Sequence, residues 1–229
     1  MKILSHAMLI TLVSSCVGFA QDAILENKAF ETLKKYGAEI RYNKARDIYR
    51  ISDLGDIPDE KLNLLEPLLY KITMIGVGDR KTKLFMNQVK KINRLEVIFL
   101  ENNNLNDDDL LSIRKLSFIN TLGLKNNKIN GEGFKILNEL SEIKTIDLSG
   151  NPINDDNLKY FTHLKKLRII NLNNTPVTDK ALDIISNYET RELVVVTVIG
   201  TKVTKKAAER FYKTRGVEAC INSKDCHLY

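Results

Sequence analysis

The sequence predicts an α/β solenoid in which about seven similar units, each with one strand and one helix, stack side by side. Three observations support this prediction. Apolar positions recur at a spacing of about 24 residues, which is typical of repeat architectures. Within each unit, apolar residues first alternate with other residues and later return at helical spacing. A polar residue suited to begin a helix separates these two patterns.

The repeat is clearest in four central units and weakens towards both ends. In the first unit, Asp53 and Pro58 stand where apolar residues are expected, and in the second unit Arg80 takes the place of an asparagine. Terminal units of solenoids are usually atypical because one of their faces meets water. The equivalent positions of the central units are Leu95, Ile98, Leu100, Asn103 and Leu105; Ile119, Leu122, Leu124, Asn127 and Ile129; Ile143, Ile146, Leu148, Asn151 and Ile153; and Leu167, Ile170, Leu172, Thr175 and Val177.

Each unit opens with the pattern Leu-x-x-Ile-x-Leu, whose alternation predicts a short strand. An asparagine follows at a fixed distance. Pointing into the solenoid, it can bind backbone groups that leave the strand and would otherwise be buried without a partner. Stacking places these side chains in a ladder, with a hydroxyl group in the later units: Asn103, Asn127, Asn151, Thr175 and Thr201.

A helix is expected after each strand, because a capping residue precedes apolar residues at helical spacing. The expected caps are Asn106, Asn130, Asn154, Thr178 and Thr204. Carboxylates gather just after two of them, at 107–109 and 155–156, and could be interpreted as calcium ligands. Their place in the first helical turn favours a simpler interpretation, since the helix dipole stabilises negative charge there.

This set of residues resembles the leucine-rich repeat family across about residues 95–205. The resemblance implies a curved solenoid with parallel strands on the concave face and helices outside, similar to the ribonuclease-inhibitor-like class. The chain looks most like secreted bacterial members, whose units often end in Thr-x-Val-Thr-Asp. Residues 175–179 carry this signature, and residues 201–204 carry part of it. Such proteins tend to have an N-terminal helix before the repeats, to which residues 29–40 are similar.

The first twenty residues predict a secretory signal. An uncharged, largely apolar run precedes two small residues, Gly18 and Ala20, at the positions that a signal peptidase must accommodate. Cleavage after Ala20 would give a secreted or periplasmic protein. Residues 13–16 also resemble a bacterial lipobox, in which Cys16 would be lipidated and would anchor the protein to a membrane. The expected organisation is a signal at 1–20, an N-terminal helical cap at 21–47, the solenoid at 48–216 and a C-terminal cap at 217–229.

Cleavage would leave Cys220 and Cys226 as a pair in an oxidising compartment, which favours a disulfide near the C-terminus. With His227 they could instead bind zinc, but a fourth ligand is not evident. The run Leu193–Val196 would be an aggregation-prone edge unless residues 211–220 cover it.

Composition disfavours several functions. The chain has 35 basic and 29 acidic residues, interspersed along its length, so its formal charge of +6 does not indicate a nucleic-acid partner. The three histidines, His6, His163 and His227, cannot be placed beside a nucleophile by any repeat-based argument. Residues 76–78 lack the setting of a dinucleotide site. We expect neither catalytic residues, cofactor nor metal, and we expect a monomer.

Side chains between the buried strand positions form the candidate binding surface on the concave face. Phe99 is its one large aromatic residue and could anchor a partner or pack against its neighbours. The sequence therefore predicts a protein-binding scaffold, with a structural or anchored module without a discrete binding site as the alternative. The candidate residues are Met74, Val97, Phe99, Glu101, Thr121, Lys125, Thr145, Asp147, Ile169, Asn171, Asn173, Val195 and Thr197.

Overall fold

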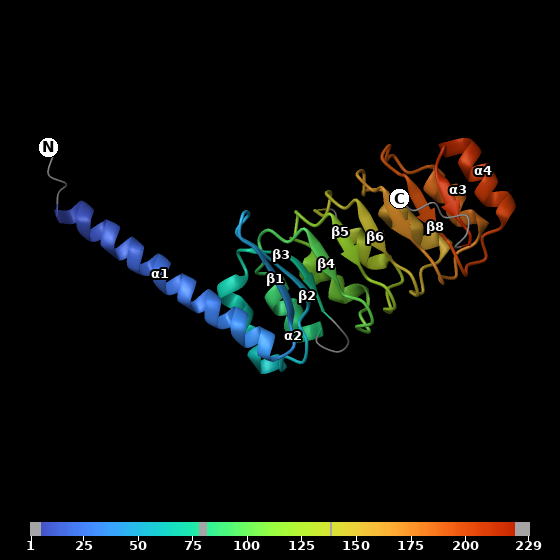
Figure 1. The fold of residues 1–229 in the computed structure, drawn as a ribbon. Coiled ribbons are helices and arrows are strands. Elements are labelled where there is room, and N and C mark those ends of the chain that lie inside the picture. Colours follow the sequence, from blue (N-terminus) through green and yellow to red (C-terminus); the bar gives the residue numbers. More distant parts are fainter. Residues whose placement is uncertain (1–5, 78–81, 138, 223–229) are drawn as a thin grey trace.

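A single curved sheet runs the length of the molecule (Figure 1), and helices cover its other side. The computed structural model describes residues 6–77, 82–137 and 139–222. The nine strands of the sheet follow one another in sequence order, and every neighbouring pair from β2 to β9 is parallel. They are β1 (Glu39–Asn43), β2 (Ile48–Asp53), β3 (Ile72–Gly76), β4 (Val97–Phe99), β5 (Thr121–Gly123), β6 (Thr145–Asp147), β7 (Ile169–Asn171), β8 (Val195–Thr197) and β9 (Glu218–Cys220).

The predicted leucine-rich repeat solenoid is confirmed. Strands β2 to β8 begin the seven expected units, and equivalent residues of neighbouring units are Cα partners. One fully buried side chain from each strand forms a continuous row through the core. This row consists of Ile51, Ile75, Ile98, Leu122, Ile146, Ile170 and Val196.

The helical layer mixes two kinds of helix. The expected helices of the three central units are 3-10 helices, η2 (Asp107–Ile113), η3 (Glu132–Ile136) and η4 (Asp155–Phe161). A 3-10 helix rises about 2.0 Å per residue, so a few residues can cross the layer. The other helices are α1 (His6–Lys35), η1 (Asp59–Leu68), α2 (Thr82–Val89), α3 (Asp179–Ser186) and α4 (Lys205–Arg215).

The N-terminal end differs from the expected helix over residues 29–40. Helix α1 ends at Lys35, and Gly37 adopts a φ of 82°, a left-handed conformation that favours glycine and ends helices. Ile40 lies in β1, which forms an antiparallel hairpin with β2. The expected boundary at residue 47 therefore falls in the turn of this hairpin. Leu33 is fully buried and attaches the end of α1 to the core.

The segment predicted as a signal lies partly outside the described residues, which start at residue 6. Helix α1 runs through the expected cleavage site and projects from the end of the solenoid (Figure 1). Within the described part of the chain, no helix has the length and apolar character needed to cross a membrane.

At the C-terminal end, β9 pairs with β8, as expected for a segment that covers this edge. Phe211 of α4 is buried beneath it, while Val194 remains 48% exposed. The guanidinium group of Arg215 donates to the carbonyls of Ser186, Tyr188 and Thr190, and so holds the loop that follows α3. Cys220 is buried, and the other two C-terminal candidates, Cys226 and His227, lie outside the described residues.

Candidate binding surface on the concave face

Two rows of side chains cross the concave face, one from each outward position of the short strands. Register partners define the rows, because each strand contributes one residue to each of them. The first row contains Arg50, Met74, Val97, Thr121, Thr145, Ile169 and Val195. The second row contains Gly76, Phe99, Gly123, Asp147, Asn171 and Thr197.

Phe99 lies across the neighbouring strand. A Cβ atom built on Gly123 would lie 2.6 Å from Cδ1 of Phe99, so the ring fills the space that a side chain at position 123 would need. The glycine thus allows the ring to lie against the sheet while leaving it partly exposed. Met74 and Val97, in the first row, are also half-buried. Together the three residues present an apolar surface on a rigid sheet.

In the C-terminal half of the concave face, polar side chains form hydrogen bonds within the protein. Asp147 accepts from the backbone and hydroxyl of Ser149, at 2.9 and 2.6 Å. Asn171 accepts from Asn173 and from Thr197, and Asn173 in turn accepts from the backbone of residue 199. These side chains stabilise the loops that leave the strands, so they are less available to a partner.

Exposure also differs along the two rows. Val195 and Thr197 have the expected register but are 7% and 5% exposed. Lys125 is exposed, whereas Glu101, Thr121, Thr145 and Ile169 are half-buried. By exposure, the predicted surface therefore extends from β3 to β7 and excludes β8.

Arg41 and Arg50 extend the same face at its N-terminal end, and the sequence analysis missed both. They are Cα partners on β1 and β2, and both are exposed. Their neighbours Ile40 and Ile51 are buried, so the arginines point to the opposite, concave side. The alternation of polar and apolar residue types in 39–43 was the available signal, but the repeat does not extend to that segment.

The asparagine ladder joins neighbouring units through their backbones. Asn127 Nδ2 donates to the carbonyl of Leu100 at 2.8 Å, while Oδ1 accepts from the backbone of Asn103 and Leu105. Asn151 makes the same kind of contacts one unit later, to 124 and 129. All three ladder asparagines are buried. Their side chains fix the loops that follow the strands and hence the edge of the concave face.

Thr175 and Thr201 replace the asparagine with shorter side chains. Each hydroxyl donates at 2.6 Å to a carbonyl of its own unit, that of Leu172 or Val198. Asn127 also donates to the carbonyl of Leu124 in its own unit, so the threonines keep this local bond and lack the bond to the preceding unit.

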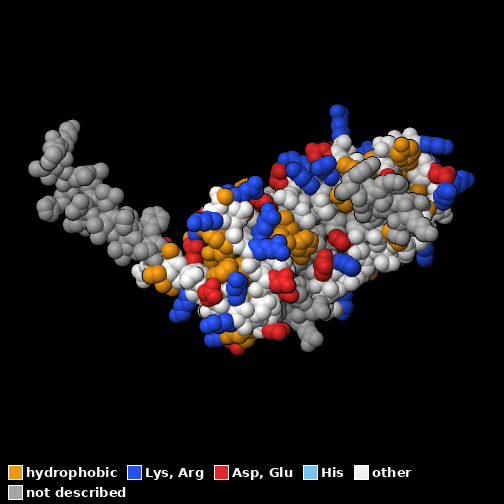
Figure 2. Space-filling model, viewed as in Figure 1, with side chains coloured by type: hydrophobic (Ala, Val, Ile, Leu, Met, Phe, Trp, Pro, Cys, Tyr) orange, Lys and Arg blue, Asp and Glu red, His pale blue; other side chains and the backbone are white. Residues whose placement is uncertain are grey.

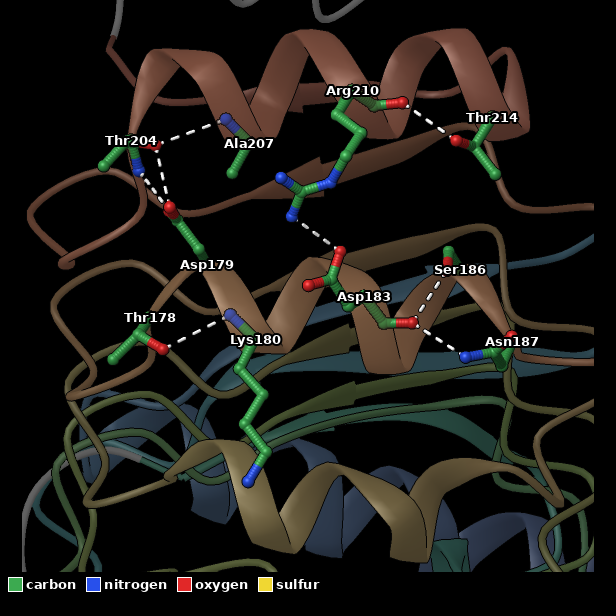
Figure 3. Close-up of polar contacts among 10 residues, drawn as sticks. All are labelled: Thr178, Asp179, Lys180, Asp183, Ser186, Asn187, Thr204, Ala207, Arg210 and Thr214. Carbon is green, nitrogen blue, oxygen red and sulfur yellow. Dashed lines mark hydrogen bonds and ion pairs between the residues drawn. The ribbon is translucent and has the colours of Figure 1, made fainter.

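A second ladder, formed by carboxylates, runs along the start of the helices. Asp107 accepts from the backbone of 130, 131 and 133 in the next unit, at 2.7 to 3.0 Å. Asp155 binds the backbone and hydroxyl of Thr178, and Asp179 binds those of Thr204. Figure 3 shows the Asp179 contact at the start of α4. These carboxylates therefore accept hydrogen bonds at the start of the helix in the next unit, in addition to the interaction with the dipole of their own helix that the sequence predicted.

The turn after each strand needs a left-handed residue. Asn102, Asn126 and Asn174 have φ between 53° and 57°, and Gly150 and Gly200 have 69° and 71°. Asparagine and glycine adopt this conformation most readily. A Cβ atom at Gly150 would also lie 2.1 Å from Oδ1 of Asn126, so the side chain of Asn126 occupies the space that a side chain at position 150 would need.

A charged cluster ties helix α1 to the hairpin. Lys71 forms ion pairs with Glu26 at 2.8 Å and with Asp47 at 3.1 Å, and Tyr70 donates to Glu26. Burial lowers the pKa of Lys71, but its hydrogen bonds to both carboxylates outweigh burial and raise the pKa. The hydroxyl of Tyr42, followed by Lys71, lowers the pKa of Asp47. The cluster joins α1 to the hairpin, and the charges of Lys71, Glu26 and Asp47 are paired with one another.

Within the described parts of the chain, no group of three or more His, Cys, Asp or Glu side chains is placed to hold a metal ion.

No protein-family model matches the sequence, and no curated protein does. Two similar solved structures are an internalin C2 and an internalin (inlF), both from Listeria monocytogenes. The first is 18% identical over 63% of this chain and 58% of its own, with a TM-score of 0.47. The second is 14% identical over 71% of this chain and 57% of its own, with a TM-score of 0.45. This chain thus spans less than two thirds of either internalin chain.

Proposed function

We propose that this protein is a non-enzymatic scaffold of the cell envelope or exterior that binds another protein on its concave face. The observation that carries the proposal is the apolar surface of Met74, Val97 and Phe99. These side chains are partly exposed on a sheet whose register is fixed on both sides. Aromatic side chains in such a setting often supply much of the energy of an interface.

The size of the face limits what it can hold alone. Seven strands about 4.8 Å apart, most of them three residues or about 10 Å long, give on the order of 300 Å². A stable complex buries about 800 Å² on each partner, so the partner should also contact the loops beside the strands. Lys125 and Glu101 lie where such contacts would form, just after β5 and β4.

The location outside the cytoplasm rests on the composition of residues 1–20. Removal of these residues would leave Gln21 as the first residue, within α1 and ahead of Glu26 in the charged cluster. Mass spectrometry of the N-terminus tests this directly. A mature chain that begins at Gln21 supports secretion, and a lipidated Cys16 would support the anchored alternative. An intact Met1 would contradict both.

The remaining assignments belong to the same proposal. The caps at 21–47 and 217–229, the solenoid at 48–216, the disulfide between Cys220 and Cys226, and the monomeric state are retained as expectations. The repeat subclass is retained too: α3 and α4 support the ribonuclease-inhibitor-like class, whereas the 3-10 helices η2 to η4 do not.

The experiment that tests the proposal is a pull-down from the native envelope and medium. Wild-type protein is compared with the double variant Phe99→Asp, Lys125→Glu. The matched control is Phe118→Asp, Lys115→Glu, which makes the same changes at exposed positions outside the strands. Circular dichroism checks that all three proteins are folded.

A partner that is lost only with the concave-face variant would support the proposal. Equal retention by all three proteins would place binding on the helices or caps and contradict it. A wild-type protein that retains nothing would favour the structural alternative.

A further inference from the structure

Two arginines face each other at the N-terminal end of the concave face. Arg41 and Arg50 are direct partners across the antiparallel pair β1 and β2. Directly opposed side chains have Cβ atoms about 4.5 to 5.5 Å apart, and like charges in this position are destabilising. The fold therefore accepts an unfavourable pair on an otherwise ordinary hairpin.

The charges of this pair are not balanced nearby. Among the described residues, no carboxylate lies within ion-pair distance, 4.0 Å, of either guanidinium. Glu39 is two residues away on the same strand, but it accepts a hydrogen bond from Ser52. By contrast, Lys71 behind the hairpin has two carboxylates. Guanidinium groups remain charged at all relevant pH values and match carboxylates in a two-pronged geometry.

Apolar side chains continue the row directly beside the arginines. Arg50 is the register partner of Met74, which is the partner of Val97. Neighbouring strands are about 4.8 Å apart, so the backbone positions of Met74 and Val97 lie about 5 and 10 Å from that of Arg50. In Figure 2, basic side chains lie next to a group of hydrophobic ones near the N-terminal end of the sheet.

This spacing fits a peptide. Residues two apart in an extended chain are about 7 Å apart and lie on the same face. The acidic residues Glu39, Glu101 and Asp147 flank the patch and interrupt the continuous basic stripe that a nucleic acid would need.

We infer that the concave surface of Arg41, Arg50, Met74, Val97 and Phe99 binds an acidic segment of a partner protein, in which carboxylates alternate on one face with large apolar side chains. The inference rests on the proposed function and specifies the chemistry of the partner. The arginines bind the carboxylates, and the apolar residues receive the side chain beside them. Binding would relieve the repulsion between the two guanidinium groups.

The test uses a fluorescein-labelled peptide of sequence Glu-Ser-Phe-Ser-Glu-Ser-Leu-Ser-Glu, measured by fluorescence anisotropy on the full chain. One control peptide carries lysine in place of glutamate, and another carries serine in place of phenylalanine and leucine. One protein variant carries both Arg41→Glu and Arg50→Glu and is called the arginine variant. The control variant carries both Lys202→Glu and Lys206→Glu, which make the same change of charge at exposed positions near the C-terminal end of the solenoid.

The labelled peptide with glutamate, phenylalanine and leucine should bind the wild type and the variant at Lys202 and Lys206 equally. Affinity should fall about tenfold or more with the arginine variant and with either control peptide, because both kinds of contact are required. Equal binding by the arginine variant would overturn the inference. Absence of peptide binding would overturn it too, as would arginine-dependent binding of inorganic polyphosphate in its place.

A stability measurement separates binding from folding. Arg50→Thr introduces the residue type that occupies the equivalent position of two central units, Thr121 and Thr145. This variant should lose peptide affinity while its thermal midpoint stays unchanged or rises. A lowered midpoint would show that Arg50 supports the fold, and would contradict the inference.

Failure of the inference can be told apart from failure of the proposed function. If the pull-down partner is lost with the Phe99 and Lys125 variant but kept with the arginine variant, concave-face binding stands and its acidic specificity is wrong. If both variants keep the partner, both proposals fail.

Discussion

The units that begin with β5 and β6, called central here, and the last two units, which begin with β7 and β8, are joined to their neighbours in different ways. In the centre, Asn127 and Asn151 bind the backbone of the preceding unit. In the last units, Thr175 and Thr201 bind within their own unit. There, the α-helices take over part of the coupling.

Helices α3 and α4 join the last units through side-chain contacts of their own. Arg210 pairs with Asp183 at 2.7 Å (Figure 3), and Asp179 caps the start of α4. Arg215 binds three carbonyls at the end of α3 and in the loop that follows. Carboxylate caps join neighbouring units in both regions, so a repeat can lose the asparagine bonds at the strand edge and keep its coupling in the helical layer. Each prediction below tests one part of this difference.

The largest effect is expected in the core that both regions share. Leu148 and Leu172 are equivalent and fully buried, one in each region. Leu148→Ala and Leu172→Ala should each lower the free energy of unfolding by about 2 to 5 kcal/mol, through lost burial and a cavity. Urea unfolding measures both. A silent Leu148→Ala would refute the repeat register, and markedly unequal losses would show that the two regions do not share one core.

The next largest effect should separate the two kinds of ladder residue. Asn151→Ala leaves the carbonyls of Leu124 and Leu148 without their side-chain partner, and should cost about 1 to 3 kcal/mol. Thr175→Val leaves one carbonyl and should cost about 0.5 to 1.5 kcal/mol. The difference in urea midpoint measures the coupling that the asparagine adds. Equal costs would mean that its bond to the preceding unit contributes nothing.

A smaller effect is expected in the helical layer. Asp179→Ala removes the cap of the next helix and should cost about 0.5 to 2 kcal/mol. Asp183→Ala, one turn later on the same helix, breaks an exposed ion pair and should cost about 0 to 1 kcal/mol. Thermal unfolding at low and high salt distinguishes them, since salt should weaken the second effect more. The reverse order would refute a structural role for the carboxylate ladder.

Much of this fold could be predicted from the sequence because each unit repeats the same pattern of buried strand residues followed by a ladder residue. The spacing of Ile98, Leu122 and Ile146 placed the strands, and the asparagine after each strand placed the ladder. The carboxylate ladder had a visible signal as well, because Asp155 precedes Thr178 by nearly one period, as Asp179 precedes Thr204. The sequence analysis assigned these carboxylates to their own helix because it considered each unit alone.

The parts that could not be predicted lie where the repeat ends. The antiparallel strand β1 has no equivalent unit, and Gly37 ends the helix that was expected over residues 29–40 just before this strand. The pairing of Arg41 with Arg50 depends on this hairpin, so it could not be inferred from the period. The contact of Phe99 with Gly123 required the register of two strands and the absence of a side chain on one of them.

The smallest predicted effect concerns His163, which lies just after η4, where the central and last units meet. Burial lowers its pKa below the ordinary value of 6.5, although backbone contacts with Tyr160 and Leu137 act in the opposite direction. Its buried Nε2 has no hydrogen-bond partner in the described structure. As the pH is lowered through about 6.5, the histidine takes up a proton in the unfolded chain before it does so in the folded protein. The free energy of unfolding therefore decreases as the pH is lowered, until the pKa of the folded protein is reached.

In urea unfolding between about pH 7.5 and pH 5.5, His163→Gln should show a weaker loss of stability than the wild type. An identical loss in both proteins would mean that the environment of His163 does not disfavour its charged form, and that the junction between the two regions is insensitive to pH.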